Sequence, residues 1–151
     1  MAKGVDRFRA STSGLDLTII EHESSTHTAQ EAADAVGAPV GAIVKSLLFL
    51  ADESPLLVLA SGRNRVDSKV LGDRLGVSLR MADADTVKEA TGFSIGGVPP
   101  FGHPSALDTV MDEDFFELDQ LWAAAGSATA VFSISPQRLH ELSGARVLRI
   151  T

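Results

Sequence analysis

A single lysine interrupts an apolar segment that is long enough to form a central strand. Lys45 stands within residues 42–50, where Ser46 is the only other polar residue. A lysine is rarely buried without a partner, because burial disfavours the ammonium and lowers its pKa, whereas a nearby anion raises it. Two interpretations fit. Lys45 either ends a strand with its ammonium in water, or it binds an anion or acts catalytically in a cleft.

A segment rich in glycine and proline is the second candidate for chemistry. Gly96-Gly97-Val98-Pro99-Pro100 follows a predicted helix. Glycine adopts backbone conformations that expose amide groups, so a rigid loop of this kind can hold a carbonyl or carboxylate oxygen through its N–H groups. An ordinary surface turn has the same composition. The residues alone leave both interpretations open.

A serine in this region matches a hydrolase motif, but its context does not fit. Gly92-Phe93-Ser94-Ile95-Gly96 has the letters of the G-x-S-x-G nucleophile elbow. The elbow needs a strand before the serine and a helix after it. Here a predicted helix precedes Ser94, and Gly97-Val98-Pro99-Pro100 cannot begin a regular helix. We therefore reject a serine nucleophile, and the absence of cysteine excludes a thiolate.

The histidines form no metal-binding motif. His22, His27, His103 and His140 contain no HExxH pair, and His27 with Glu31 on one helix face would supply only two ligands. The chain also has no Walker loop and no dinucleotide fingerprint. We therefore expect neither a metal nor a cofactor.

The composition predicts one globular domain over residues 1–151. The chain is 44% hydrophobic, and no stretch approaches the ~20 apolar residues of a membrane span. The N-terminus lacks the apolar core of a signal peptide, so we expect a cytoplasmic protein. The net charge of −7 argues against a protein that coats DNA or RNA. Any nucleic-acid contact is local.

Alternating and periodic patterns predict the elements that hold these residues. We expect strands over residues 17–20, 43–51, 56–60, 106–111, 128–134 and 146–150, the second and third forming a hairpin. Helices are expected over residues 5–10, 29–36, 66–75, 83–90 and 135–144, the second capped by Thr28 and the fourth by Asp83 or Asp85. Strands, helices and a hairpin together predict an α/β or α+β domain with a mixed sheet.

The spacing around the only tryptophan favours a helix. Leu118, Leu121, Trp122 and Ala125 recur at helical intervals. We assign them to the core, without a function.

Four segments, taken in order, resemble the YbaK family of aminoacyl-tRNA deacylases, also called the YbaK/EbsC type. Its members include freestanding relatives of the editing domain inserted in bacterial prolyl-tRNA synthetase. The segments are residues 28–33, 43–49, 65–71 and 90–103. The resemblance covers nearly the whole chain. It implies a YbaK-like fold, in which a mixed, mostly antiparallel sheet forms a barrel-like core flanked by helices.

The resemblance also implies an activity, which is hydrolysis, without a metal, of the ester that joins an incorrect amino acid to tRNA. The family's invariant lysine falls on Lys45, and its G-x-x-x-P loop begins at Gly96 and ends at Pro100. We expect Lys45 to fix the 3′-terminal nucleotide. Amides near Gly96 and Gly97 would stabilise the oxyanion while a water, or a group of the substrate, attacks.

Further residues are expected to bind substrate, and basic residues to contact the tRNA backbone. The substrate-binding candidates are Thr28, Ser46, Pro100, His103 and Ser127. The tRNA-binding candidates are Arg63, Arg65 and Lys69.

The expected partner is the acceptor end of an aminoacyl-tRNA, and a synthetase is a second candidate. Alanine or cysteine on proline tRNA is the expected substrate. Two other functions stay open at this point. One is a non-catalytic module that binds aminoacyl-tRNA or a synthetase, and the other is an esterase acting on a small acyl ester without RNA.

Overall fold

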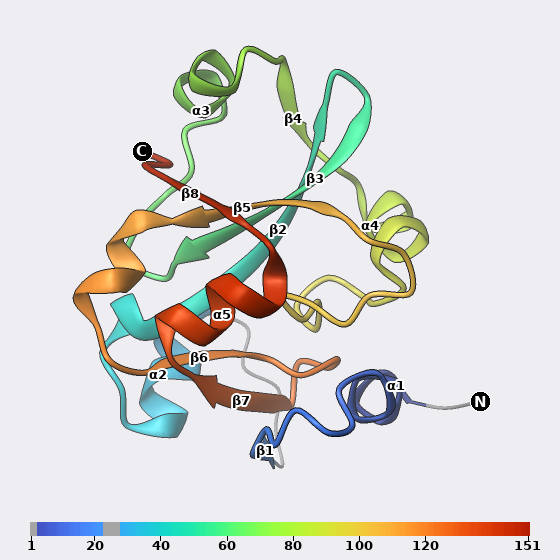
Figure 1. Cartoon of the computed structure of the whole chain (residues 1–151), viewed down its shortest axis with the longest axis vertical. Coiled ribbons are helices and arrows are strands. Elements are labelled where there is room, and N and C mark those ends of the chain that lie inside the picture. Colours follow the sequence, from blue (N-terminus) through green and yellow to red (C-terminus); the bar gives the residue numbers. More distant parts are fainter. Residues whose placement is uncertain (1–2, 23–27) are drawn as a thin grey trace.

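The computed structural model describes residues 3–22 and 28–151, so His27 lies outside the described residues. Within these ranges an eight-stranded mixed sheet runs in the order β1-β7-β6-β2-β3-β5-β8, and β4 pairs with β2 (Figure 1). Four of the strand pairings are antiparallel and three are parallel. The predicted mixed α/β fold is confirmed.

The strand bounds follow the apolar segments closely at the centre of the sheet and less closely at its edges. The strands are β1 Ile19–Glu21, β2 Ile43–Ala51, β3 Ser54–Ser61, β4 Leu79–Met81, β5 Asp108–Asp112, β6 Leu121–Ala124, β7 Ala130–Ile134 and β8 Arg146–Leu148. The predicted β2–β3 hairpin is confirmed. The short strand β4 escaped prediction because three residues carry too little periodic signal.

The two central strands supply core residues to both faces of the sheet. Leu57 and Leu59 of β3 pack with Phe8 and Phe132 on one face, while Val58 belongs to a second cluster on the other face. Successive strand side chains point to opposite faces, so a strand covered on both faces is apolar throughout. This burial fixes β2 and β3 as the frame on which Lys45 is held.

The helical prediction around the tryptophan was wrong. Residues 121–124 form strand β6, which pairs with β2 in parallel and with β7 antiparallel. Burial alternates along β6, since Leu121 and Ala123 are buried and Trp122 and Ala124 are half-buried. Over so short a segment, the apolar spacing fits both the helical and the strand periodicity. Pairing with two neighbouring strands makes the segment a strand.

The helices are short and begin and end at specific residues. They are α1 Gly4–Ser11, α2 Ala29–Val36, α3 Ser68–Leu75, α4 Ala84–Thr91 and α5 Pro136–Ser143, with 3-10 turns η1 Val40–Ala42 and η2 Glu113–Glu117. The side chains of Thr28, Asp67 and Asp83 each accept a first-turn amide hydrogen bond. The predicted caps Thr28 and Asp83 are confirmed, and α3 starts at Ser68 because Asp67 caps it.

No helix in the described ranges has the length and hydropathy needed to cross a membrane.

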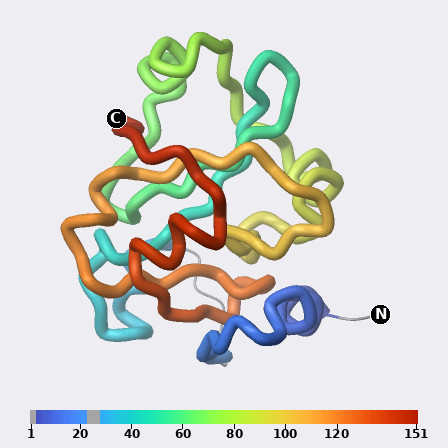
Figure 2. Tube along the Cα trace, viewed as in Figure 1, coloured from blue at the N-terminus to red at the C-terminus, as the bar shows by residue number. Residues whose placement is uncertain are grey.

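Helix α1 is anchored against two loops that are distant in the sequence. The Arg7 guanidinium lies 4.7 Å from the centre of the Phe93 ring and donates to the carbonyl of Gly92. Phe8 stacks on Phe132 with ring centres 5.2 Å apart. Figure 2 shows the N-terminal helix near the turn that joins β6 and β7. A Cβ atom on Gly126 would lie 2.4 Å from the carbonyl oxygen of Gly4, so only glycine fits there.

The contact between α1 and the turn at Gly126 can be tested by a matched pair of substitutions. Gly126 and Gly144 both have positive φ, but a Cβ on Gly144 meets no atom within 4 Å. Gly144→Ala therefore reports the backbone cost alone, roughly 1 kcal/mol. Gly126→Ala adds a clash with α1, which we expect to lower the free energy of unfolding by a further ~1–3 kcal/mol. Urea unfolding measures both, and equal losses would show that α1 is not packed tightly there.

Candidate active site

A largely apolar cavity of about 290 Å³ lies against the middle of β2. Strands β2, β6 and β7, helices α2 and α4, and the loop after α4 contribute to its lining. Small side chains predominate on several sides, among them Ala29, Ala32, Ala123 and Ala130. Among the described residues, Lys45 is the only charged residue that lines it. The cavity therefore combines an apolar interior with one cation.

Lys45 is half-buried, and its ammonium is held by a neutral acceptor. Its Nζ donates to the backbone carbonyl of Asn64 at a distance of 2.6 Å. Burial lowers the pKa of Lys45 below its usual value, the carboxylate of Asp112 opposes this shift, and the nearby Arg65 charge adds to it. The lysine is thus neither a snorkelling strand-end residue nor a member of a direct salt bridge in the described structure.

Three predicted substrate-binding residues line the same cavity. Thr28 caps α2 by accepting the amide of Glu31 at 3.1 Å, and Ser127 bonds Thr129 within the turn before β7. Ser46 differs, because its buried Oγ has no hydrogen-bond partner in the described part of the chain. A buried hydroxyl without a partner costs free energy, so a polar ligand group would be stabilised beside it.

The two glycines predicted to stabilise an oxyanion lie in different situations. Gly96 is exposed and lines the cavity, and its amide donates to no described residue. Gly97 is buried, its N–H donates to the carbonyl of Ser94 at 2.9 Å, and its Cα packs on the backbone of Ser127. The amide of Gly97 is therefore occupied by the loop itself, which the sequence could not reveal. The amide of Gly96 is not used by any described residue.

Pro100 and His103 do not line the cavity. His103 Nε2 bonds the carbonyl of Pro99 at 2.7 Å, and its ring meets the edge of Phe93. Burial lowers the pKa of His103, and because a carbonyl only accepts, Nε2 carries the proton. In this structure His103 closes the loop at its C-terminal end and holds Pro99 in place.

The three cations predicted to contact tRNA have different surroundings. Arg63 forms ion pairs with Glu117 at 2.7 Å and with Asp114 at 3.4 Å. Arg65 follows the carbonyl that holds Lys45, and its side chain forms no ion pair with a described residue. Lys69 lies on α3, beside a shallow depression away from the cavity. Only Arg65 combines a free charge with proximity to Lys45.

Ser94 lacks the structural context of a nucleophile elbow. It lies between helix α4 and a turn, with no strand before it and no helix after it. The rejection of a serine nucleophile therefore agrees with the observed backbone.

Sequence reasoning missed Asn64, Asp112 and Trp122. Trp122 lines the cavity from β6, while Asn64 and Asp112 act on Lys45 through a hydrogen bond and through charge. Asn64 and Asp112 lie 48 positions apart and meet because β3 and β5 pair in parallel. An asparagine three residues after the end of a buried strand was the available signal.

No group of three or more His, Cys, Asp or Glu side chains that could hold a metal ion occurs in residues 3–22 and 28–151.

Comparisons of the sequence and of the fold with known proteins point to one family. The sequence model of the aminoacyl-tRNA editing domain family matches residues 23–142. An uncharacterised Bacillus subtilis protein, YwhH, is 31% identical over 130 residues, covering 85% of this chain and 83% of that protein. A proline–tRNA ligase of Lactobacillus gasseri is 33% identical over 114 residues, which cover 75% of this chain but only 20% of the ligase.

A solved structure shares the whole fold. The crystal structure of a candidate trans-editing enzyme for prolyl-tRNA synthetase is 40% identical and superimposes with a TM-score of 0.93, covering 100% of this chain and 98% of that one. The family model spans the segments that build the cavity from Thr28 to Val131. The chain belongs to the aminoacyl-tRNA editing domain family.

Proposed function

We propose that the protein is an aminoacyl-tRNA deacylase that hydrolyses the ester of a mischarged tRNA in the cytoplasm, with alanine or cysteine on proline tRNA as the substrate. The observation that carries the proposal is the position of Lys45, a cation that pairs with no described carboxylate and lines an apolar cavity. Such a site accepts a small uncharged side chain inside and an anionic group at the cation. The 3′ end of an aminoacyl-tRNA has both parts.

The size and lining of the cavity support a small amino acid. A volume of about 290 Å³, shared between the amino acid and part of the terminal ribose, leaves little room for a large side chain. No acidic residue among the described ones lines it, so a basic side chain would be buried without a counter-charge. Trp122 and the alanines of β6 add further uncharged lining.

The reaction requires orientation and oxyanion stabilisation rather than a protein nucleophile. Lys45 binds phosphate or ribose oxygens of the terminal nucleotide and fixes the ester. A water, or a hydroxyl of the substrate, attacks the carbonyl carbon, and the Gly96 amide donates to the developing oxyanion. Collapse of this intermediate breaks the carbon–oxygen bond to the ribose, whose oxygen takes up a proton. With water as the final acceptor, the free amino acid and uncharged tRNA leave.

Single-turnover hydrolysis of a panel of mischarged tRNAs tests the proposal. The panel includes alanine and cysteine on proline tRNA, together with correctly charged prolyl-tRNA. We expect rapid release of alanine or cysteine and slow release of proline. Tight binding of aminoacyl-tRNA without turnover would favour a non-catalytic module, and turnover of small acyl esters without affinity for tRNA would favour an esterase.

Replacing Lys45 by methionine separates catalysis from folding. Lys45→Met keeps the length of the side chain and removes the charge, so we expect hydrolysis to fall by at least about 10²-fold. Because folding lowers the pKa of Lys45, the unfolded chain binds the proton more tightly, and the charged form destabilises the fold at neutral pH. Chemical unfolding should therefore show no loss of stability. Full activity in this variant would remove Lys45 from the mechanism.

The unpartnered hydroxyl of Ser46 gives a second test of the cavity. Ser46→Ala removes a buried polar atom that has no partner among the described residues, so we expect the free energy of unfolding to rise by about 1 kcal/mol. If Ser46 contacts a polar group of the substrate, kcat/KM falls in the same variant. A loss of stability, measured by urea unfolding, would show instead that the hydroxyl is satisfied in the free protein.

Arg65 and Arg63 are expected to differ in their effect on tRNA affinity. Arg65→Ala should raise the Kd for tRNA and reduce the slope of log K against log salt by about 0.7–1, because one phosphate contact is lost. Arg63 is already paired with Glu117 and Asp114, so Arg63→Ala should leave the slope nearly unchanged. Salt titrations of both variants decide this, and equal changes in slope would contradict the assignment.

A further inference from the structure

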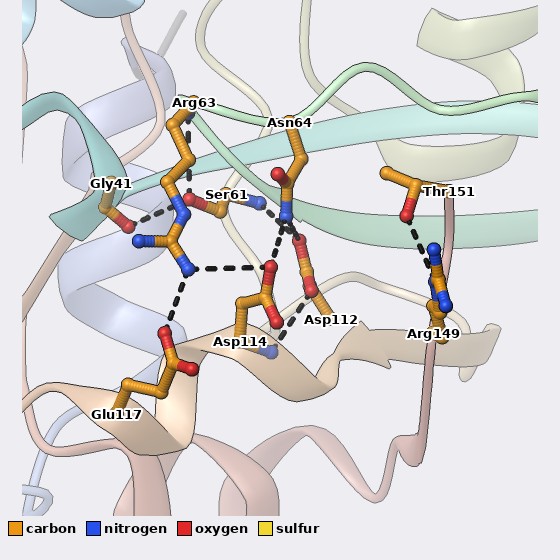
Figure 3. Close-up of polar contacts among 9 residues, drawn as sticks. All are labelled: Gly41, Ser61, Arg63, Asn64, Asp112, Asp114, Glu117, Arg149 and Thr151. Carbon is orange, nitrogen blue, oxygen red and sulfur yellow. Dashed lines mark hydrogen bonds and ion pairs between the residues drawn. The ribbon is translucent and has the colours of Figure 1, made fainter.

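Asn64 contacts Lys45 through its main chain and two carboxylates through its side chain, and Figure 3 shows the side-chain amide between Asp112 and Asp114. The side-chain amide of Asn64 donates to Asp112 Oδ2 at 2.8 Å and to Asp114 Oδ2 at 2.7 Å. The backbone carbonyl of the same residue accepts the Lys45 ammonium at 2.6 Å. One residue therefore binds two carboxylates with its side chain and the cation with its main chain.

Asp112 is the fixed point of this network. It is only 1% exposed, its Oδ2 also accepts the amide of Ser61, and its Oδ1 accepts the amide of Asp114. These bonds join the end of β3 to the start of η2 and leave Asp112 little capacity to bind a further donor. The side chain of Asn64 is thus held at the end of β5, which pairs in parallel with β3.

The arrangement leaves the Lys45 ammonium without a direct contact to any described carboxylate. A carboxylate in direct contact would hold the ammonium in a salt bridge and compete with an anionic ligand. Here the Asn64 amide occupies the carboxylates, and a neutral carbonyl accepts only one of the ammonium donors. Asp112 still acts at longer range and opposes the lowering of the Lys45 pKa by burial.

We infer that Asn64 is a positioning residue for Lys45, holding its ammonium toward the cavity while keeping it out of contact with Asp112 and Asp114. The structural part of this inference concerns the free protein. Its consequence for the reaction rests on the proposed deacylase function.

The first experiment observes the Lys45 ammonium directly and does not depend on activity. In ¹H–¹⁵N spectra of lysine side chains, a hydrogen-bonded ammonium exchanges slowly with water and gives a distinct signal. We expect this signal in the wild type. In Asn64→Ala the backbone carbonyl is no longer held by the side-chain amide and the two carboxylates are released, so the signal should shift, broaden or disappear. Gln30→Ala is the matched control, because it removes an amide that donates to a carboxylate, Asp34, elsewhere on the surface. An unchanged Lys45 signal in Asn64→Ala would overturn the inference.

The second experiment measures the reaction in the same variants. We expect Asn64→Ala to lower kcat/KM on the best mischarged tRNA by roughly 10²-fold, the effect of a misplaced catalytic group, and Gln30→Ala to leave it unchanged. If the wild type hydrolyses no mischarged tRNA, the proposed function fails while the ammonium spectra still decide the positioning role.

A pH profile distinguishes positioning from a general loss of structure, and serves if Asn64→Ala does not fold. Asn64→Asp keeps the shape of the side chain, but an ionised carboxyl cannot donate. The new carboxyl would face Asp112, Asp114, Arg63 and Lys45, with Arg149 near Asp114. The two carboxylates, which contact this side chain directly, raise its pKa, and the cations oppose this rise. Protonation then restores a donor, so the ratio of the wild-type rate to the variant rate should fall toward one as the pH falls. A ratio independent of pH, with both proteins folded, would contradict the positioning role.

Discussion

The structure depends on keeping one ammonium partly buried and still charged beside an apolar cavity. Burial alone would drive Lys45 toward the neutral form, and a direct carboxylate partner would hold it in a salt bridge. The protein meets both requirements by giving Lys45 a backbone carbonyl at 2.6 Å and placing Asp112 nearby without contact. A ligand phosphate or hydroxyl can then approach an ammonium whose orientation is fixed and which no described carboxylate contacts.

The sheet is the part of the fold that makes this possible. Strand β2 carries Lys45 and pairs with β3 on one side and β6 on the other, so the lysine is fixed in the centre of the structure. The parallel pairing of β3 with β5 brings Asp112 under the end of β3, where Asn64 follows. Helix α1 anchors the opposite side by holding Phe93 and Gly126. Gly126 is followed directly by Ser127, which lines the cavity.

Local features were predictable from the sequence, and long-range ones were not. The Thr28 cap, the β2–β3 hairpin and the unusual position of Lys45 each depend on a few adjacent residues whose propensities agree. The strand at Trp122 and the pairing of Asn64 with Asp112 depend on which strands become neighbours. The occupied amide of Gly97 depends on a loop conformation that composition alone does not determine.

The most direct test of the account is to locate a stable substrate analogue on the protein. Adenosine 5′-phosphate carrying alanine through a 3′-amide bond reproduces the aminoacyl end of tRNA and resists hydrolysis. Titrated into ¹⁵N-labelled protein, it should shift the Gly96 amide and the Lys45 ammonium signals, along with amides of β6, and Lys45→Ala should abolish these shifts. Shifts confined to another surface, or undiminished binding without Lys45, would contradict the assignment of this cavity as the active site.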